Sequence, residues 1–277
     1  MSDTLSLLSL VLTLRPLQPA ADLPHLGRAA HALLLDAVRR SEPALAERIH
    51  AGSDLRPLTA SGLIGYSARA GLNPERTYAV RLTALNAPVA QALQAAAQAG
   101  PLRAGEVVRL DEHHFRVEAA TDDAAEHPWA RAMSYEALSA PWLLGRESPA
   151  RRVGLEFVSP TTFRSDGKHV PVPMPEWVFG SLREKWNAFA PVALPDEVRR
   201  FAAECLALSR FDLRTYSLPL KEGLRIGAVG RATYTALNAD RYWLSLINLL
   251  ADFALYAGVG AGTTMGLGQC RRVSSDR

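Results

Sequence analysis

Hydrophobic and polar positions follow one another along the first half of the chain in patterns that predict strands and helices in turn. An almost continuous apolar run over 5–14 predicts a buried strand, and apolar residues three and four positions apart predict a helix over 27–39. A second, short helix starts at Ser41, with Pro43 in its first turn. The elements predicted next are strands at 58–66 and 78–85, an Ala-rich helix at 89–99, and a hairpin through 107–110 and 115–119. This order of strand, helix, strand, strand, helix, strand indicates a ferredoxin-like domain.

The second half of the chain repeats this order of elements without repeating the residues themselves. It opens with a strand at 152–158, followed by a loop whose prolines exclude a helix. The elements predicted after the loop are helices over 176–188 and 197–209, strands over 212–218 and 223–237, a helix over 240–256, and a last strand within 268–273. We therefore expect the α+β class, with two ferredoxin-like domains in tandem, each an antiparallel sheet with helices on one face.

Length and composition agree with two domains rather than one. A chain of 277 residues with 48% apolar residues can bury two ordinary cores. The stretch 121–150 is rich in Ala, Pro and charged residues and is predicted to be the linker region. We expect an N-terminal domain over 1–135 and a C-terminal domain over 145–277.

Charge and cysteine content narrow the function only slightly. A net charge of +3 is weak support for nucleic-acid binding, although a pI near 9.0 permits it. Cys205 and Cys270 lack metal-ligand spacing and are expected to be buried, reduced thiols. The apolar start of the chain is too short to span a bilayer, and no other window reaches that length. We expect a cytoplasmic protein without a membrane partner, a metal or a cofactor.

A glycine-rich stretch, GVGAGTTMGLG, lies between the last predicted helix and the last predicted strand. Gly258 and Gly260 form one Gly-x-Gly pair, and Gly266 and Gly268 form another, with five residues between the pairs. No Lys follows these glycines, so the stretch is not the phosphate loop of an NTPase. A dinucleotide-binding fold requires strand, glycine loop and helix in that order, which is reversed here.

These glycines, at this place in a tandem ferredoxin-like topology, resemble those of the CRISPR-associated endoribonucleases that process repeat RNA, the sixth CRISPR-associated protein family of the RAMP superfamily. Two other stretches carry the resemblance, SPTTFRSDGKHVPVPMPEWVFGSLREKWNAF and LLLDAVRRSEPALAERIHAGSDLRPLTASGL. The resemblance implies cleavage of CRISPR repeat RNA without a metal. The 2′-hydroxyl of the RNA would attack, leaving a 2′,3′-cyclic phosphate and a 5′-hydroxyl and producing crRNA for antiviral defence. The implied partners are repeat RNA and crRNA, then other CRISPR effector proteins, for a monomer or a homodimer.

Three residues are candidates for catalysis. A histidine can act as acid or base near neutral pH, and His50 matches the family's active-site histidine by its place after PALAERI. Arg56 falls where the family often carries a Lys and would stabilise the phosphate. The archaeal Tyr position corresponds to Leu35, so His31, one turn earlier, is the candidate for the second proton transfer. Each residue also has a purely structural interpretation. His50 could be an ordinary histidine at a helix end, Arg56 a surface arginine, and His31 a partly buried histidine.

The candidate RNA-binding residues lie in the second half. Glycines permit positive φ and close backbone approach, so the loop's N–H groups could face a phosphate. Alternatively, the glycines only permit a tight crossing from helix to strand, and the charged residues form an ordinary solvated face. The residues concerned are Gly258, Gly260, Gly266 and Gly268, the hydroxyls of Thr263 and Thr264, and the cations Arg225, Arg231, Arg164 and Lys168.

Two functions of other classes compete with an endoribonuclease. A non-catalytic RAMP subunit that binds or scaffolds crRNA would share the fold and the glycine loop, and the pair His50 and Arg56 distinguishes the two. A small-molecule enzyme with two ferredoxin-like domains would need a deep apolar pocket with converging polar groups. No motif in the sequence supports that second alternative.

Overall fold

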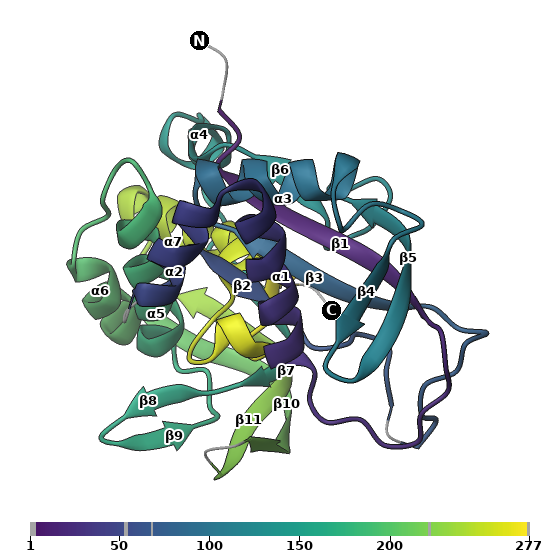
Figure 1. The fold of residues 1–277 in the computed structure, drawn as a ribbon. Helices are drawn as coiled ribbons and strands as arrows, with labels where there is room; N and C mark the ends of the chain where they lie inside the picture. Colours follow the sequence, from purple (N-terminus) through teal and green to yellow (C-terminus); the bar gives the residue numbers. More distant parts are fainter. Residues whose placement is uncertain (1–3, 53–54, 68, 221–222, 276–277) are drawn as a thin grey trace. The chain divides into compact units, whose positions relative to one another are not determined.

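The structure is a computed structural model that describes residues 4–52, 55–67, 69–220 and 223–275. The chain divides into two compact units (Figure 1). The first comprises Met1–Met133 with Thr264–Gly266, and the second comprises Ser134–Thr263 with Leu267–Arg277. Each unit is built on its own antiparallel sheet.

The sheet of the first unit has the strand order β2-β3-β1-β5-β4, with β6 also paired to β1. Its central strand β1 (Leu7–Pro16) lies antiparallel to both β3 (Tyr78–Ala84) and β5 (His113–Thr121). The remaining elements are β2 (Leu58–Ala60), β4 (Val107–Leu110), β6 (Arg131–Met133), α1 (Gly27–Ser41), α2 (Pro43–Ala51) and α3 (Ala87–Ala99). With α1 following β1 and α3 following β3, this is the order of a ferredoxin-like domain.

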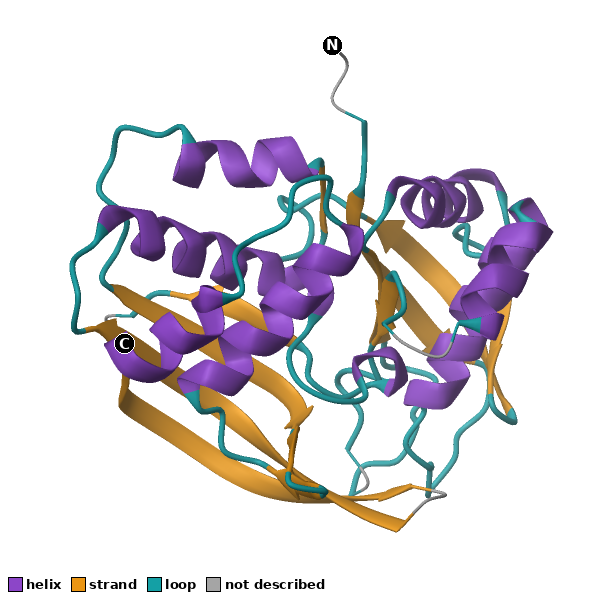
Figure 2. Cartoon of the chain, turned by 90° about the vertical axis from the view of Figure 1, so that its left-hand side faces the viewer, coloured by secondary structure: helices purple, strands orange, loops and turns teal. Residues whose placement is uncertain are grey.

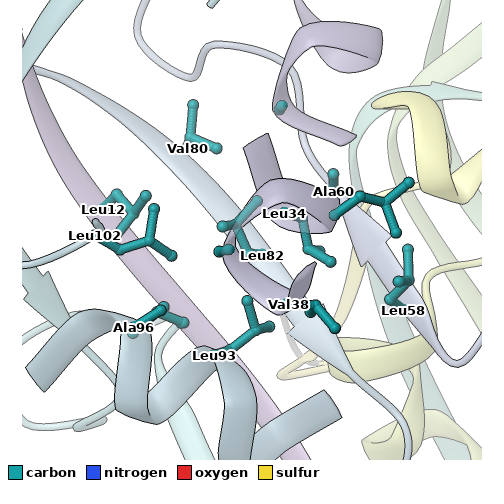
Figure 3. Packing of buried hydrophobic residues seen from close by; sticks show 14 of the residues in the cluster. Leu12, Leu34, Val38, Leu58, Ala60, Val80, Leu82, Leu93, Ala96 and Leu102 are labelled. Carbon is teal, nitrogen blue, oxygen red and sulfur yellow. The ribbon is translucent and has the colours of Figure 1, made fainter. Parts of the chain in front are cut away.

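The core of the first unit lies between its helices and its sheet. Figure 3 shows leucine, valine and alanine side chains from α1, α3 and the strands gathered into one cluster. Strand β1 is buried on its other face as well, where the Ser9 hydroxyl donates to the Trp129 carbonyl at 2.6 Å and accepts from Arg81 at 3.2 Å. Burial on both faces explains why this strand reads as a continuous apolar run.

The second unit repeats the arrangement around β7 (Arg152–Thr161), which lies antiparallel to β11 (Gly223–Ala236) and β12 (Cys270–Val273). The sheet order is β10-β11-β7-β12, and helices pack on one face of the long strands (Figure 2). The other elements are α5 (Pro175–Phe189), α6 (Glu197–Cys205), β10 (Leu206–Leu220) and α7 (Arg241–Ala257). The expected α+β class with tandem ferredoxin-like folds is confirmed.

The stretch 121–150, predicted as a linker, contains β6 and a helix, α4 (Tyr135–Leu143). The Ser134 hydroxyl accepts from the Ala137 N–H at 3.0 Å and so caps the first turn of α4. Tyr135 and Leu138 are buried. The composition of this stretch gave no sign of the capping serine or of these two buried residues.

Three other element predictions were partly wrong. The strand predicted over 58–66 is limited to β2, and the helix predicted over 197–209 ends at Cys205. Pairing of Leu206 with Ala236 starts β10 there, because the sheet captures residues whose local pattern suits a helix. The predicted loop after β7 contains a small hairpin, β8 (Phe163–Ser165) and β9 (Lys168–Val170).

Candidate active site

His31 and Arg56, predicted from distant parts of the sequence, meet in the first unit. His31 lies on α1, and Arg56 lies shortly before β2. The Arg56 Nη1 atom is 3.0 Å from Nε2 of His31. Because a guanidinium only donates, Nε2 must accept, and the imidazole carries its proton on Nδ1. The contact therefore fixes the tautomer of His31.

The surroundings of His31 keep it uncharged. Burial, together with the charges of Arg56 and His50, lowers the pKa of His31 to about 4. Its Nδ1 atom is buried and has no hydrogen-bond partner within the described part of the chain. At neutral pH this ring is a neutral imidazole whose unprotonated nitrogen faces a cation.

His50 lies in the last turn of α2, where the buried residues Leu45 and Ile49 hold the opposite face of the helix. Its side chain is exposed, and its charge acts on His31. The three predicted catalytic residues thus share one neighbourhood inside the first unit. Leu35 is buried in the core of this unit and offers no polar group to that neighbourhood.

The glycine loop adopts a backbone conformation that other residues rarely adopt. Gly258, Gly260, Gly266 and Gly268 have positive φ angles, and so has Gly262, which the sequence analysis did not single out. A Cβ on Gly268 would lie 2.1 Å from the Val259 carbonyl oxygen. The loop is therefore glycine-rich because of its own packing, whatever it binds.

Many loop amides are already engaged inside the protein. The N–H of Val259 donates to Gly268 O at 2.8 Å, and that of Gly260 donates to the Ser181 hydroxyl at 3.0 Å. The hydroxyl of Thr263 is buried and contacts Lys185, whose Nζ is 3.3 Å away. These bonds favour a structural role for the ends of the loop, so the prediction that its amides face a phosphate remains for the central part.

That central part, Thr264–Gly266, is grouped with the first unit. Gly266 forms an isolated parallel bridge with Ser61, and a Cβ on Gly266 would lie 2.4 Å from Cε1 of His25. Burial lowers the pKa of His25, whose Nδ1 has no hydrogen-bond partner among the described residues. No motif in the sequence pointed to His25.

The predicted RNA-binding cations of the second unit have different surroundings. Arg164 and Lys168 lie on the β8–β9 hairpin, where Arg164 is paired across the strands with His169. Arg225 on β11 places Nη1 at 3.4 Å from Nδ1 of His169. Burial, then the charges of Arg225 and Arg164, lower the pKa of His169. Three basic side chains thus gather at one place, and the sequence analysis missed the histidine among them.

Arg231 is instead bound to a carboxylate. Its Nε and Nη2 atoms donate to Oε1 of Glu156 at 3.0 and 2.7 Å, while Arg271 donates to the other carboxylate oxygen. Burial would raise the pKa of Glu156, but the hydrogen bonds and charges of the two arginines hold it below its usual value. Arg231 can contact a phosphate only by giving up part of this ion pair.

The described residues include no group of three or more His, Cys, Asp or Glu side chains that could hold a metal ion. None of the helices in that part of the chain combines enough length with enough apolar character to cross a membrane.

The protein belongs to the class of α+β proteins with two ferredoxin-like units in tandem, and a glycine loop lies between its last helix and its last strand. Residues 155–270 match the family model described as CRISPR-associated endoribonuclease Cas6. The CRISPR-associated endoribonuclease Cas6 of Mycobacterium tuberculosis (strain CDC 1551 / Oshkosh) is 34% identical over 125 residues. That match spans 44% of this chain and only 38% of the length of the curated relative.

Likeness to solved structures extends over the whole chain. A structure described as a Cas6 product complex is 29% identical with a TM-score of 0.77, covering 97% of this chain and 99% of that one. A second Cas6 product complex is 25% identical with a TM-score of 0.78, covering 96% of this chain and 100% of that one. The resemblance to the Cas6 family of CRISPR-associated endoribonucleases, expected from three stretches of the sequence, is confirmed.

The packing of the glycine loop can be tested by adding a methyl group. In Gly268→Ala the new Cβ meets a carbonyl oxygen at a residue with φ of +64°, so backbone must shift. We expect the free energy of unfolding, measured with urea, to fall by at least about 2 kcal/mol. Gly105→Ala is the matched control, since Gly105 has φ of +91° with nothing within 4 Å of the added Cβ, and should cost only about 1 kcal/mol. Equal losses would contradict the packing argument.

The neutral state of His31 predicts a pH dependence of stability. Its pKa falls from 6.5 to about 4 on folding, so between these values the unfolded chain binds more protons than the folded one. The stabilisation is complete above pH 6.5 and is lost as the pH falls toward 4. We expect the free energy of unfolding of the wild type to decrease more steeply over this interval than that of His31→Gln. Parallel curves from chemical denaturation would contradict the assignment.

Proposed function

We propose that this protein is an endoribonuclease that cuts CRISPR repeat RNA to produce crRNA, without a metal ion. The observation that carries the proposal is the grouping of His31, Arg56 and His50 in one unit of a Cas6-like chain. A protein that only holds RNA needs cations, but it has no use for a buried neutral imidazole beside an exposed one. The non-catalytic RAMP subunit is therefore the less favoured function.

The chemistry requires a proton acceptor, a proton donor and positive charge at the phosphate. The RNA's own 2′-hydroxyl is the nucleophile and attacks the adjacent phosphorus, and the 5′-oxygen leaves. Arg56 would exchange its bond to His31 for the phosphate oxygens, where charge increases in the transition state. Nε2 of His31 is then open to accept the 2′-hydroxyl proton, and His50 protonates the leaving 5′-oxygen. The products are a 2′,3′-cyclic phosphate and a 5′-hydroxyl.

RNA binding is assigned to the second unit and to the glycine loop. Arg225, with Arg164 and His169 nearby, supplies positive charge at one place, and Lys168 lies on the same hairpin. Phosphate contacts of this kind position an RNA without reading its sequence. Arg231 would contribute only by giving up part of its ion pair with Glu156, which binds it through two hydrogen bonds.

The catalytic proposal predicts separate losses of rate and binding. His50→Ala and His31→Ala should each lower the single-turnover cleavage rate about a hundred- to ten-thousand-fold, because each removes a proton-transfer group. Affinity for the RNA, measured with a 2′-deoxy substrate that cannot be cut, should change little. Arg56→Ala should also slow the chemical step, since its charge matters most in the transition state.

The controls test the mechanism itself. His114→Ala removes an exposed histidine of the same unit and should leave the rate unchanged. A 2′-deoxy substitution before the scissile phosphate should abolish cleavage, and EDTA should have no effect. If EDTA stopped the reaction, or the deoxy substrate were cut, the mechanism would be wrong. Full activity of His50→Ala with loss in His31→Ala would overturn only the role of His50.

The binding proposal predicts a difference between two arginines. Arg164→Ala should lower the slope of log affinity against log salt by about 0.7, the amount expected for one lost contact to single-stranded RNA. Arg231→Ala should change the slope less, because its charge is offset by Glu156. Equilibrium binding across a salt series measures both slopes. A larger effect at Arg231 than at Arg164 would reverse the assignment.

A further inference from the structure

Lys185 is a buried charged residue that the proposed catalytic and RNA-binding sites leave unused. It lies on α5 among the residues that face the core, Val178, Leu182 and Trp186. Its own exposed fraction is 6%. A lysine is rarely buried to this extent unless its ammonium group has partners.

The partners of Lys185 lie at the end of α7 and in the first half of the glycine loop. Its Nζ donates to the carbonyl oxygens of Ala257 and Gly258 at 3.0 Å each, and to Oγ1 of Thr263 at 3.3 Å. The two carbonyls end α7, where a cation also interacts favourably with the helix dipole. One side chain therefore uses its three protons to join the end of α7 to the loop five residues further on.

We propose that Lys185 is the buried cation of the glycine loop, which holds the start of the loop in shape so that its central part can bind a phosphate group of the RNA. This inference rests on the proposed function and deepens it. It assigns Lys185 as a positioning residue, acting on RNA through the loop rather than by contact.

The ammonium group of Lys185 determines how Thr263 takes part in this hydrogen bond. An ammonium group has no lone pair, so Thr263 Oγ1 must accept, and the hydroxyl proton of Thr263 is left to point away from Lys185. The hydroxyl oxygen therefore serves as an acceptor that ties this part of the loop to α5. The Gly260 amide is likewise held by Ser181 on the same helix as Lys185, so α5 fixes the loop at two places.

The pKa of Lys185 links its charge to the binding of a phosphate. All three hydrogen bonds of Lys185 go to uncharged oxygens, and burial lowers its pKa to about 7, against smaller upward effects from Cys270 on β12 and Glu184 on its own helix. The end of α7 presents main-chain carbonyls to it. A phosphate on the loop would stabilise the charged form and raise this pKa. RNA binding should then take up a proton, so affinity should weaken as the pH rises above 7.

The experiment compares Lys185→Met with Arg183→Met, which removes a cation two positions away on α5 that is paired with Asp196 instead of the loop. Affinity for 2′-deoxy repeat RNA is measured from pH 6.5 to 9 for both variants and the wild type. We expect Lys185→Met to bind about tenfold more weakly than the Arg183→Met control at pH 6.5. We also expect the affinity of Lys185→Met to lack the decrease above pH 7 that the control retains. A purely structural role of Lys185 would not remove that decrease.

Thr263→Val keeps the size of the side chain and removes the hydroxyl that accepts from Lys185, so it decides the matter if Lys185→Met does not fold. We expect it to weaken binding while circular dichroism stays unchanged. A folded Lys185→Met with the affinity and pH profile of the control would overturn the inference, as would unchanged binding by Thr263→Val. If the wild type neither bound nor cut repeat RNA, the proposed function would fail, and this inference with it.

Discussion

Each unit depends on one central strand whose two edges are both paired. In the first unit β1 is hydrogen-bonded to β3 and β5, and in the second β7 is hydrogen-bonded to β11 and β12. A shift of one residue in the register of such a strand would move every side chain to the opposite face of the sheet. The helix that follows β1 is fixed in turn, which gives His31 on α1 a defined place, and the glycine loop joins α7 to β12 at the edge of β7.

The proposed chemistry uses the difference between two histidines in one neighbourhood. Burial and the neighbouring charges of Arg56 and His50 keep His31 neutral, while His50 lies exposed on α2. A buried and an exposed titratable group side by side suit an acid and a base that work together. In the proposed mechanism Arg56 fixes the tautomer of His31 before RNA binds and would then bind the phosphate.

The elements with regular patterns could be predicted from the sequence, and those that depend on distant partners could not. The continuous apolar run of β1 and the helical spacing in α7 identified both elements to within two residues. The hairpin β8–β9 was missed although Asp166 and Gly167, both with positive φ, form the kind of turn that joins two strands. Lys185 could have been suspected because it falls at helical spacing from Val178 and Leu182, but its three partners are far away in sequence. His25 and His169 owe their surroundings to tertiary contacts alone.

The steric demands of the glycine loop explain its glycines without any reference to RNA binding. Gly258, Gly260 and Gly268 are needed because carbonyl oxygens occupy the space in which a side chain would begin. A related chain without the proposed cleavage activity would still need them in order to fold. The glycine motif is therefore a marker of architecture. On the proposed mechanism, a survey of related sequences that aims to find active nucleases would be sorted by the residues at positions 31, 50 and 56.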